Sequence, residues 1–124
     1  MPLTKNNLPK IRKGLKPATA RGIGRAAGYV ADLARQLAPY DNDPERAPGP
    51  HLRDTIQVEG EDGDTRRAVT AGRGLDDPRA VVNEFGGTTI DFPAQPYMTP
   101  AAEAITPEVE IKKELLDLYR SNGL

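Results

Sequence analysis

The chain has 124 residues, of which 37% are hydrophobic and 5% aromatic, and twelve each are glycine and proline. This composition predicts a single domain over residues 1–124 with a thin hydrophobic core. The absence of Cys excludes disulfides and thiolate metal sites, and no apolar run approaches the roughly 18 residues that a membrane span requires. We therefore expect a soluble protein without a membrane partner.

Charge is unevenly distributed, although the net charge is only -1. Residues 1–35 contain eight basic side chains and one acidic side chain, whereas the rest of the chain contains nine basic and seventeen acidic ones. This separation favours contact between the basic part of one chain and an acidic face of a neighbour, or a polyanion such as DNA. The alternative is an ordinary solvated helix face.

Residues 1–16 are predicted to form a basic arm that leads into a helix over residues 17–38. Apolar and small residues recur every three to five positions between Leu8 and Leu37, which is the pattern of one helical stripe. Pro17 is expected to start, break or kink this helix, since proline inside a helix costs about 3 kcal/mol.

Glycine is unusually frequent in the predicted helix. Gly24 and Gly28 each cost about 1 kcal/mol relative to alanine, so packing has to compensate. Together with neighbouring alanines they are interpreted as a surface that another backbone can approach closely. The segment Gly22 to Ala27 formally matches a dinucleotide-binding fingerprint, but no strand precedes it, so we expect no cofactor there.

A proline-rich surface loop is predicted over residues 39–51, because four prolines prevent regular structure. The loop begins next to Tyr40 and ends at His51. His51 is the sole histidine of the chain and has no cysteine nearby, so we expect a surface residue and no metal site.

Residues 52–98 are predicted to form a β-rich unit. Residues 52–59 alternate loosely, residues 60–65 have turn chemistry, and residues 67–71 provide a return strand, which together indicate a hairpin. The acidic residues of the turn, including Asp62 and Asp64, are expected at a solvated tip. Residues 80–85 fit a strand or a short helix, and residues 88–92 fit another strand.

A helical segment is predicted over residues 99–121. Thr99 and Thr106 are each followed by proline, so both fit helix N-caps. The apolar stripe of the last helix is expected to consist of Val109, Leu115, Leu116 and Tyr119.

The segment around Glu84 and Phe85 invites two interpretations. Glu84 could form an acid-base pair with Asp91, but nothing indicates the shared pocket that such a pair needs. We favour Glu84 as a hydrogen-bond acceptor for a backbone amide or a neighbour's arginine, and Phe85 as a core residue whose replacement by alanine costs about 3 to 5 kcal/mol. Phe92, Tyr97 and Met98 are expected in the core or in an interface.

Three segments in fixed order resemble one protein family: GPHLRDTI at residues 49–56, AVVNEFG at 80–86 and PAQPYMTP at 93–100. Their order and spacing are similar to those of the tail-completion, or head-tail joining, proteins of long-tailed phages, the gene-product-ten-like group of lambdoid siphophages. The resemblance covers the chain from about residue 8 to residue 120.

The resemblance implies a structural virion protein and no enzyme or cofactor. Its members have an α+β fold, and here we expect a long N-terminal amphipathic helix and a C-terminal helix packed on a small antiparallel sheet. Members form a ring around the DNA channel of the neck, with six-fold or twelve-fold symmetry expected here. The implied partners are copies of the same chain, head-closure or connector proteins, tail terminator or tail tube proteins, and channel DNA. The implied location is the virion neck, with the host cytoplasm during assembly.

Two residue sets follow as candidates. The interface or channel candidates are Arg12, Lys13, Lys16, Arg21, Arg25, Gly24, Gly28, Tyr40, Asp62 and Asp64. The candidates for holding the fold are Leu52, Ile56, Phe85, Gly86, Phe92, Pro96, Tyr97 and Pro100. The alternative function is a small DNA-binding module that uses the basic arm.

Overall fold

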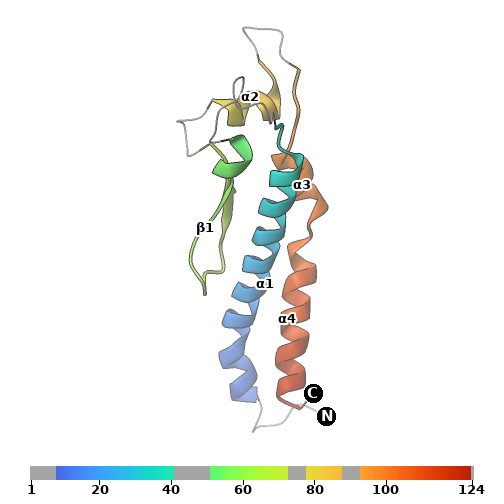
Figure 1. The fold of residues 1–124 in the computed structure, drawn as a ribbon. Coiled ribbons are helices and arrows are strands. Elements are labelled where there is room, and N and C mark those ends of the chain that lie inside the picture. The colour runs from blue at the N-terminus through green and yellow to red at the C-terminus, as the bar shows by residue number, and fades with distance from the viewer. Residues whose placement is uncertain (1–7, 41–50, 73–77, 88–92, 124) are drawn as a thin grey trace. The chain divides into compact units, whose positions relative to one another are not determined.

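The structure is a computed structural model, and it describes residues 8–40, 51–72, 78–87 and 93–123 (Figure 1). The expected α+β class is confirmed, with helix predominating. The elements in chain order are helix α1 (Leu8–Leu37), the 3-10 helix η1 (Leu52–Thr55), strands β1 (Gln57–Glu59) and β2 (Ala68–Thr70), and helices α2 (Arg79–Phe85), α3 (Met98–Ala104) and α4 (Pro107–Ser121).

The contacts of the chain group into two compact units. Unit 1 comprises residues 1–27, 60–67 and 106–124, and unit 2 comprises residues 28–59 and 68–105. Helix α1 passes through both, with residues 8–27 in unit 1 and residues 28–37 in unit 2.

Unit 1 is built around an antiparallel helix pair, residues 8–27 of α1 beside α4 (Figure 1). Gly14 lies against Leu118, and Gly22 lies against Ile111. A Cβ atom added to Gly22 would lie 2.6 Å from the Ile111 Cα atom, so the two backbones touch at this level. The close backbone approach was predicted for Gly24 and Gly28 and is wrong for both, because a Cβ atom at Gly24 would meet only the Arg67 guanidinium, at 3.6 Å, and one at Gly28 would have no neighbour within 4 Å. The approach occurs at Gly22 instead.

Helix α1 is continuous through Pro17. A helix start or break expected at Pro17 is wrong, because the helix begins at Leu8 and ends at Leu37. The predicted arm is therefore helical from Leu8 onward. Burial on both sides, at Ile11 (4% exposed) and Ala18 (0%), provides the packing that offsets the missing proline N–H.

The expected apolar stripe of the last helix is wrong in part. Val109 is 49% exposed and Leu116 is 39% exposed, whereas Glu110 and Glu114 are each only 7% exposed. The inner face of α4 therefore includes two carboxylates, which pair with arginines of α1 as described below.

The hairpin tip, residues 60–67, also belongs to unit 1. Gly60 and Gly63 both have positive φ, and the Glu61 N–H donates to the Asp64 carboxylate at 2.7 Å. Asp62 pairs with Arg67 at 3.3 Å and is fully exposed. The predicted solvated acidic tip is confirmed.

The core of unit 2 is formed by seven buried residues. They are Ala31, Ala34, Ala38, Leu52, Ile56, Tyr97 and Ala101, contributed by α1, η1 and α3 with their flanking residues. The Arg35 side chain donates to the Ile56 carbonyl at 2.8 Å and so links α1 to the start of β1. Among the described residues, Tyr97 has the largest fully buried side chain.

The β content of unit 2 is lower than expected. The hairpin is confirmed with Gln57 opposite Thr70 and Val58 opposite Val69, but its strands have only three residues each. Residues 52–55 form η1 and not a strand, and residues 79–85 adopt the helical alternative. The strand expected at residues 88–92 lies outside the described residues.

The two predicted N-caps had different outcomes. Thr106 is the N-cap of α4, with Pro107 at the first helical position, but its side chain makes no capping hydrogen bond. Helix α3 begins at Met98 with Tyr97 as its N-cap, so the cap expected at Thr99 is wrong by two positions.

Phe85 is not a core residue, because 75% of its surface is exposed. On α2, Ala80 and Glu84 are one helical turn apart and face inward, while the next residue after each, Val81 (58% exposed) and Phe85, is turned toward solvent. The core position expected for Phe85 is occupied by the Glu84 carboxylate.

Candidate functional site

The Glu84 carboxylate joins α2 to the start of α3 in unit 2. Its Oε2 atom accepts the N–H groups of Tyr97 and Met98, and its Oε1 atom accepts the N–H of Thr99, each at 2.9 Å. These N–H groups lie at the N-terminus of α3, where backbone donors lack helical partners. The expectation that Glu84 bonds a backbone amide is confirmed, and Asp91, considered as its acidic partner, lies outside the described residues.

These contacts shift the pKa of Glu84 strongly. Burial alone raises the pKa, but hydrogen bonding by the Thr99 side chain and by the backbone N–H groups of Tyr97, Met98 and Thr99 outweighs it and lowers the pKa to about 2. Glu84 is therefore ionised across the neutral range and cannot serve as a proton donor there. Its role in this arrangement is to fix the backbone.

Tyr97 brings the three family-like segments together. It is fully buried in the core that contains Leu52 and Ile56, its N–H donates to Glu84, and its hydroxyl donates to the Ala80 carbonyl at 3.1 Å. The segments 49–56, 80–86 and 93–100 thus meet around one tyrosine.

Thr55, for which the sequence analysis predicted no role, stabilises the first of these segments, residues 49–56, by hydrogen bonds. Only 2% of its surface is exposed, its hydroxyl donates to the Leu52 carbonyl at 2.6 Å, and the same oxygen accepts the Gly72 N–H at 2.9 Å. Gly72 has a φ of +78°, a conformation that glycine adopts without strain. A polar residue between Leu52 and Ile56 carries no signal of such a role in the sequence.

Of the residues expected to hold the fold, Leu52, Ile56 and Tyr97 are buried. Gly86 ends α2 with a φ of +83° and donates its N–H to the Val82 carbonyl. Pro96 is exposed and Pro100 is half-buried. Phe85 is exposed, and Phe92 lies outside the described residues.

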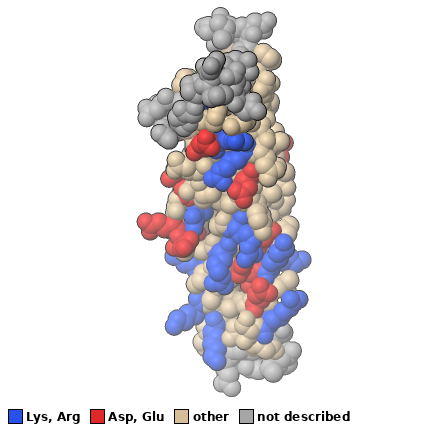
Figure 2. Space-filling model, viewed as in Figure 1, with Lys and Arg blue, Asp and Glu red and all other residues tan. Residues whose placement is uncertain are grey.

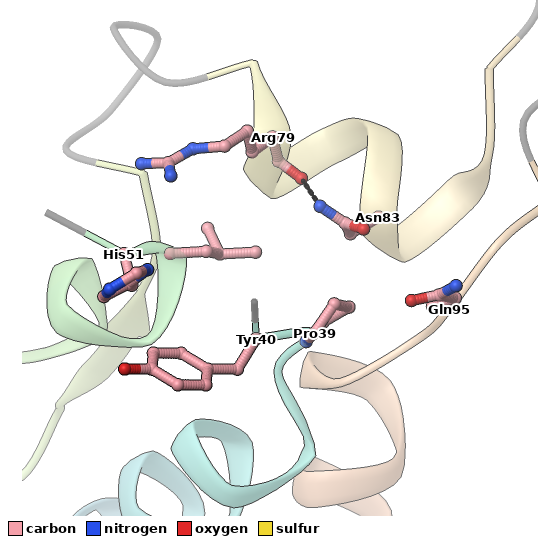
Figure 3. A pocket seen from close by; sticks show the side chains of 7 residues that line it. Pro39, Tyr40, His51, Arg79, Asn83 and Gln95 are labelled. Atoms are coloured by element: carbon pink, nitrogen blue, oxygen red, sulfur yellow. Dashed lines mark hydrogen bonds between the residues drawn. The ribbon is translucent and has the colours of Figure 1, made fainter. Parts of the chain in front are cut away.

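A pocket lies beside these segments in unit 2 (Figure 3). Its volume is about 350 Å³, and it is lined by Pro39, Tyr40, His51, Leu52, Arg79, Asn83 and Gln95. Tyr40, one of the interface candidates, is 45% exposed at this pocket. His51 is half-buried, so its expected surface position is only partly correct.

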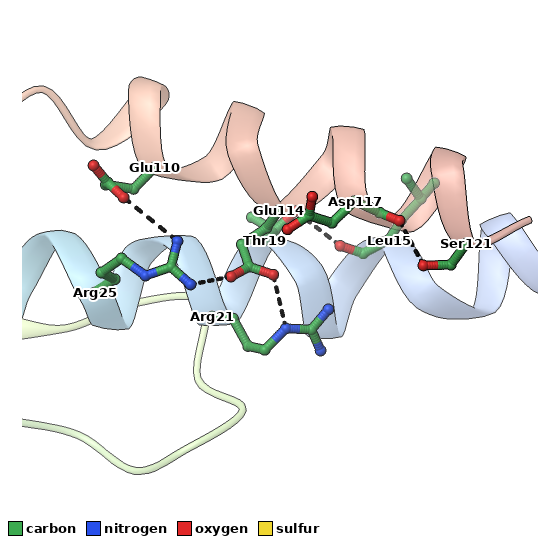
Figure 4. A network of polar contacts seen from close by, with 8 residues as sticks. All are labelled: Leu15, Thr19, Arg21, Arg25, Glu110, Glu114, Asp117 and Ser121. Atoms are coloured by element: carbon green, nitrogen blue, oxygen red, sulfur yellow. Dashed lines mark hydrogen bonds and ion pairs between the residues drawn. The ribbon is translucent and has the colours of Figure 1, made fainter. Parts of the chain in front are cut away.

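Unit 1 contains a charged seam, defined as Arg21 and Arg25 of α1 with Glu110 and Glu114 of α4 (Figure 4). Arg21 Nε lies 3.0 Å from Glu114, and Arg25 bridges Glu114 and Glu110, the latter at 3.4 Å. Lys113 also pairs with Glu110, at 3.2 Å. Two of the candidate interface arginines therefore already have partners within the chain.

The pKa values in the seam follow from these pairs. The hydrogen bond from Arg21, together with Arg25, lowers the pKa of the Glu114 carboxyl despite its burial. The hydrogen bond to Glu114 raises the pKa of the Arg25 guanidinium. Both groups stay charged at neutral pH, which favours ionic contact over proton transfer.

Basic side chains outside the seam are available to solvent on unit 1. Lys10, Arg12, Lys13 and Lys16 are exposed on α1. Figure 2 shows Lys and Arg side chains gathered where the N-terminal part of α1 and α4 lie. Of the predicted interface residues, Arg12, Lys13 and Lys16 therefore share one exposed helical segment, while Arg21 and Arg25 are committed to the seam.

The remaining interface candidates are dispersed. Gly24 and Gly28 lie in the middle of α1, and the segment Gly22 to Ala27 is wholly helical, with only helix among the described residues before it. Asp62 and Asp64 belong to the hairpin tip. Within the described ranges, no group of three or more His, Asp or Glu side chains is arranged to hold a metal ion.

Comparisons of this chain with protein-family models, with curated proteins and with solved structures found no match. None of the helices described here combines the length and the apolar character needed to cross a bilayer.

Proposed function

We propose that this chain is a structural subunit of the phage neck that completes the tail and joins it to the DNA-filled head. In this proposal, copies of the chain form a ring around the DNA channel. Head-closure or connector proteins and tail terminator or tail tube proteins are its neighbours, and the subunit has no catalytic role.

The observation that supports the proposal most directly is the convergence of the three family-like segments. Each supplies a specific contact in unit 2: Leu52 and Ile56 in the core, the Glu84 carboxylate, and the N–H groups that begin α3. Hydrogen bonds to backbone N–H groups hold the backbone in one conformation. These residues therefore stabilise the fold, which suits a structural subunit that acts through its surface.

The distribution of charge also supports assembly through side chains. Unit 1 exposes a basic segment on α1, and the hairpin tip exposes acidic groups. A ring is closed by heterologous contacts, in which one patch of each subunit meets a different patch of the next. Opposite charges on separate surfaces of one chain suit such contacts.

Deleting the gene from the phage genome that carries it tests this function. We expect infected cells to accumulate filled heads and separate tails, and supply of the intact chain from a plasmid to restore joined particles. Electron microscopy of the lysates provides the measurement. Normal joined particles without the chain would refute the neck function.

The alternative function, a DNA-binding module, is favoured by one observation, the exposed basic side chains of Lys10, Arg12, Lys13 and Lys16. Phosphate contacts of this kind release counterions, so the affinity falls with salt at a slope of about -0.9 per phosphate neutralised. If this module is the function, the isolated chain binds duplex DNA with a slope of about -3 to -4.

Neutralising the basic segment separates the two functions. Under the alternative, replacing all four residues by glutamine removes most of the salt slope in a fluorescence anisotropy titration, while the control Lys112→Gln with Lys113→Gln leaves it largely unchanged. The neck function instead predicts negligible DNA affinity for isolated wild-type protein at physiological salt.

A further inference from the structure

Helix α4 is followed by the dipeptide Asn122–Gly123, which places a side-chain amide next to an unhindered backbone nitrogen. Of the five asparagines in the sequence, Asn122 alone precedes a glycine. Glycine lacks a Cβ atom, so no side chain on residue 123 hinders the approach of its nitrogen to the Asn122 side chain. The chemistry of this pair does not depend on the neck proposal.

Hydrogen bonds at the end of α4 hold both groups apart. The Asn122 side-chain amide donates to the Leu118 carbonyl at 2.9 Å, and the Gly123 N–H donates to the Arg120 carbonyl at 3.1 Å. Asn122 is the C-cap and has a ψ of 18°. At this angle the Gly123 nitrogen nearly eclipses the nitrogen of Asn122, so it points away from the Cβ and Cγ atoms of the Asn122 side chain.

Release of the cap brings the two groups together. Helix ends fray, and their local opening free energies are the smallest in a folded protein. Ser121 and Gly123 are exposed on either side of Asn122, so water can replace the released bonds. Rotation about the Cα–C bond of Asn122 then places the Gly123 nitrogen beside the side-chain carbonyl carbon.

We propose that Asn122 is a modification site at which this chain converts asparagine to aspartate and isoaspartate without an enzyme. The Gly123 nitrogen loses its proton to hydroxide and forms a bond to Asn122 Cγ. The Cγ–Nδ2 bond breaks, and the amide nitrogen takes a proton from water and leaves as ammonia. The product of this step is a five-membered succinimide ring.

Water then opens the succinimide at one of its two carbonyl carbons. Opening at Cγ gives aspartate, and opening at the backbone carbonyl gives isoaspartate, in which the chain continues through the side chain. The net reaction consumes one water and releases one ammonia, with no oxidant or reductant.

The modification weakens the end of α4. The new carboxylate cannot donate to the Leu118 carbonyl as the amide does, and the helix dipole disfavours a negative charge at this end. Leu118 lies against Gly14 of α1. Fraying that spreads from Asn122 by one turn therefore reaches the contact between α4 and α1, and we expect the melting temperature of the converted protein to fall.

Incubation of the full-length chain at neutral pH and physiological temperature tests the site. Cleavage after lysine releases residues 114–124, which contain Asn122. Mass spectrometry over several weeks should show this peptide gaining the mass difference between an amide and a carboxyl, and chromatography should resolve an aspartate form and an isoaspartate form. An unchanged peptide at the end of the incubation would overturn the proposal.

Asn83 is the matched internal control. Its side-chain amide also donates to the carbonyl four residues earlier, at 2.9 Å, but Glu84 follows it in place of glycine. Cleavage after lysine and arginine releases it in residues 80–112. In the chain unfolded by guanidinium chloride, Asn83 should convert at least about tenfold more slowly than Asn122. Equal rates at the two asparagines would overturn the assignment to the Asn122–Gly123 pair.

Two further comparisons separate the roles of glycine and cap. Gly123→Ala adds a Cβ atom beside the attacking nitrogen and should slow conversion at least about tenfold in the unfolded chain. Unfolding of the wild type releases the two cap bonds and should speed conversion at least about fivefold, since one hydrogen bond is worth about 1 kcal/mol. An unchanged rate in Gly123→Ala would overturn the mechanism, and equal rates in the folded and unfolded wild type would overturn the restraint by the cap.

Discussion

At the residue scale, the interior of unit 2 depends on one carboxylate and one tyrosine. Glu84 satisfies three backbone N–H groups at the start of α3, and Tyr97 fills the centre of the core. Hydrogen bonds to a charged acceptor are worth more than neutral ones, about 1.5 to 3 kcal/mol each. Loss of either side chain should therefore destabilise unit 2.

Replacing Glu84 by glutamine should lower stability and reduce the acid sensitivity of the protein. The wild-type pKa of about 2 lies below the ordinary value of 4.5, so the contribution of Glu84 is fully present above about pH 4.5 and is lost as the pH falls toward 2. Glu84→Gln should cost about 2 kcal/mol at pH 7, because it loses the charge and can accept fewer of these bonds.

Urea unfolding from pH 7 down to pH 2 measures both effects. The decline in unfolding free energy on acidification should be smaller in Glu84→Gln than in the wild type. Glu103→Gln, at an exposed glutamate of α3, should behave as the wild type does. An equal decline in the wild type and Glu84→Gln would contradict the assigned role.

Tyr97 and Phe85 should differ sharply when each is replaced by alanine. Tyr97→Ala removes a fully buried ring and should cost about 3 to 5 kcal/mol. Phe85→Ala removes an exposed ring and should change stability by no more than about 0.5 kcal/mol. Chemical denaturation of both variants provides the comparison, and a larger loss for Phe85→Ala would show that α2 packs through its other face.

The sequence predicted the positions of some of these residues correctly and those of others wrongly. Leu52, Ile56 and Tyr97 were expected to hold the fold, with Tyr97 placed either in the core or in an interface, and all three are buried. The core position predicted for Phe85 was wrong, because the inward face of α2 consists of Ala80 and Glu84. The rule that apolar side chains are buried does not predict a buried carboxylate. The burial of Glu84 depends on hydrogen bonds from backbone N–H groups of another segment, which the sequence around Glu84 does not indicate.

At the element scale, the α1–α4 pair of unit 1 combines close backbone packing with buried charge. Gly22 allows contact with Ile111, and the charged seam begins at the residues directly before these two, Arg21 and Glu110. The periodicity of α1 was visible in the sequence, but the inward orientation of Glu110 and Glu114 was not. Their partners, Arg21 and Arg25, lie far away in the chain, and no local pattern pairs them.

Two glycine-to-alanine substitutions in the same helix should have opposite effects. Gly22→Ala places a Cβ atom against the Ile111 backbone, which cannot yield like a flexible side chain, and should destabilise the protein by about 1 to 3 kcal/mol. Gly28→Ala meets no neighbour within 4 Å and should stabilise it by up to about 1 kcal/mol through helix propensity.

Thermal unfolding followed by circular dichroism distinguishes these cases. The melting temperature should fall for Gly22→Ala and rise for Gly28→Ala. A stabilised Gly22→Ala would show that α1 and α4 are not in contact at this level.

At the scale of the whole molecule, α+β class was predictable and the balance of helix and strand was not. Two three-residue strands are all the sheet that the described residues contain. The alternation from residue 52 to 59 indicated a longer strand, but residues 52–55 form a 3-10 helix in which the Thr55 hydroxyl donates to the Leu52 carbonyl. The thin core expected from composition corresponds to the many alanines among its members.

A thin core also bears on the proposed function. Helix α1 buries mainly alanine, and several apolar side chains stay exposed, among them Tyr29 (45%) and Val109 (49%). Subunits of this kind gain stability from their neighbours, because association adds to the surface that one chain can bury. We therefore expect the melting temperature to rise with assembly.

Under the neck proposal, cryo-electron microscopy of the assembled phage particles is the most direct test. The account predicts a ring of density at the junction of head and tail, six-fold or twelve-fold, into which α1 and α4 fit as an antiparallel helix pair. Density of this chain elsewhere in the particle, or its absence from mature particles that have a normal junction, would contradict the account.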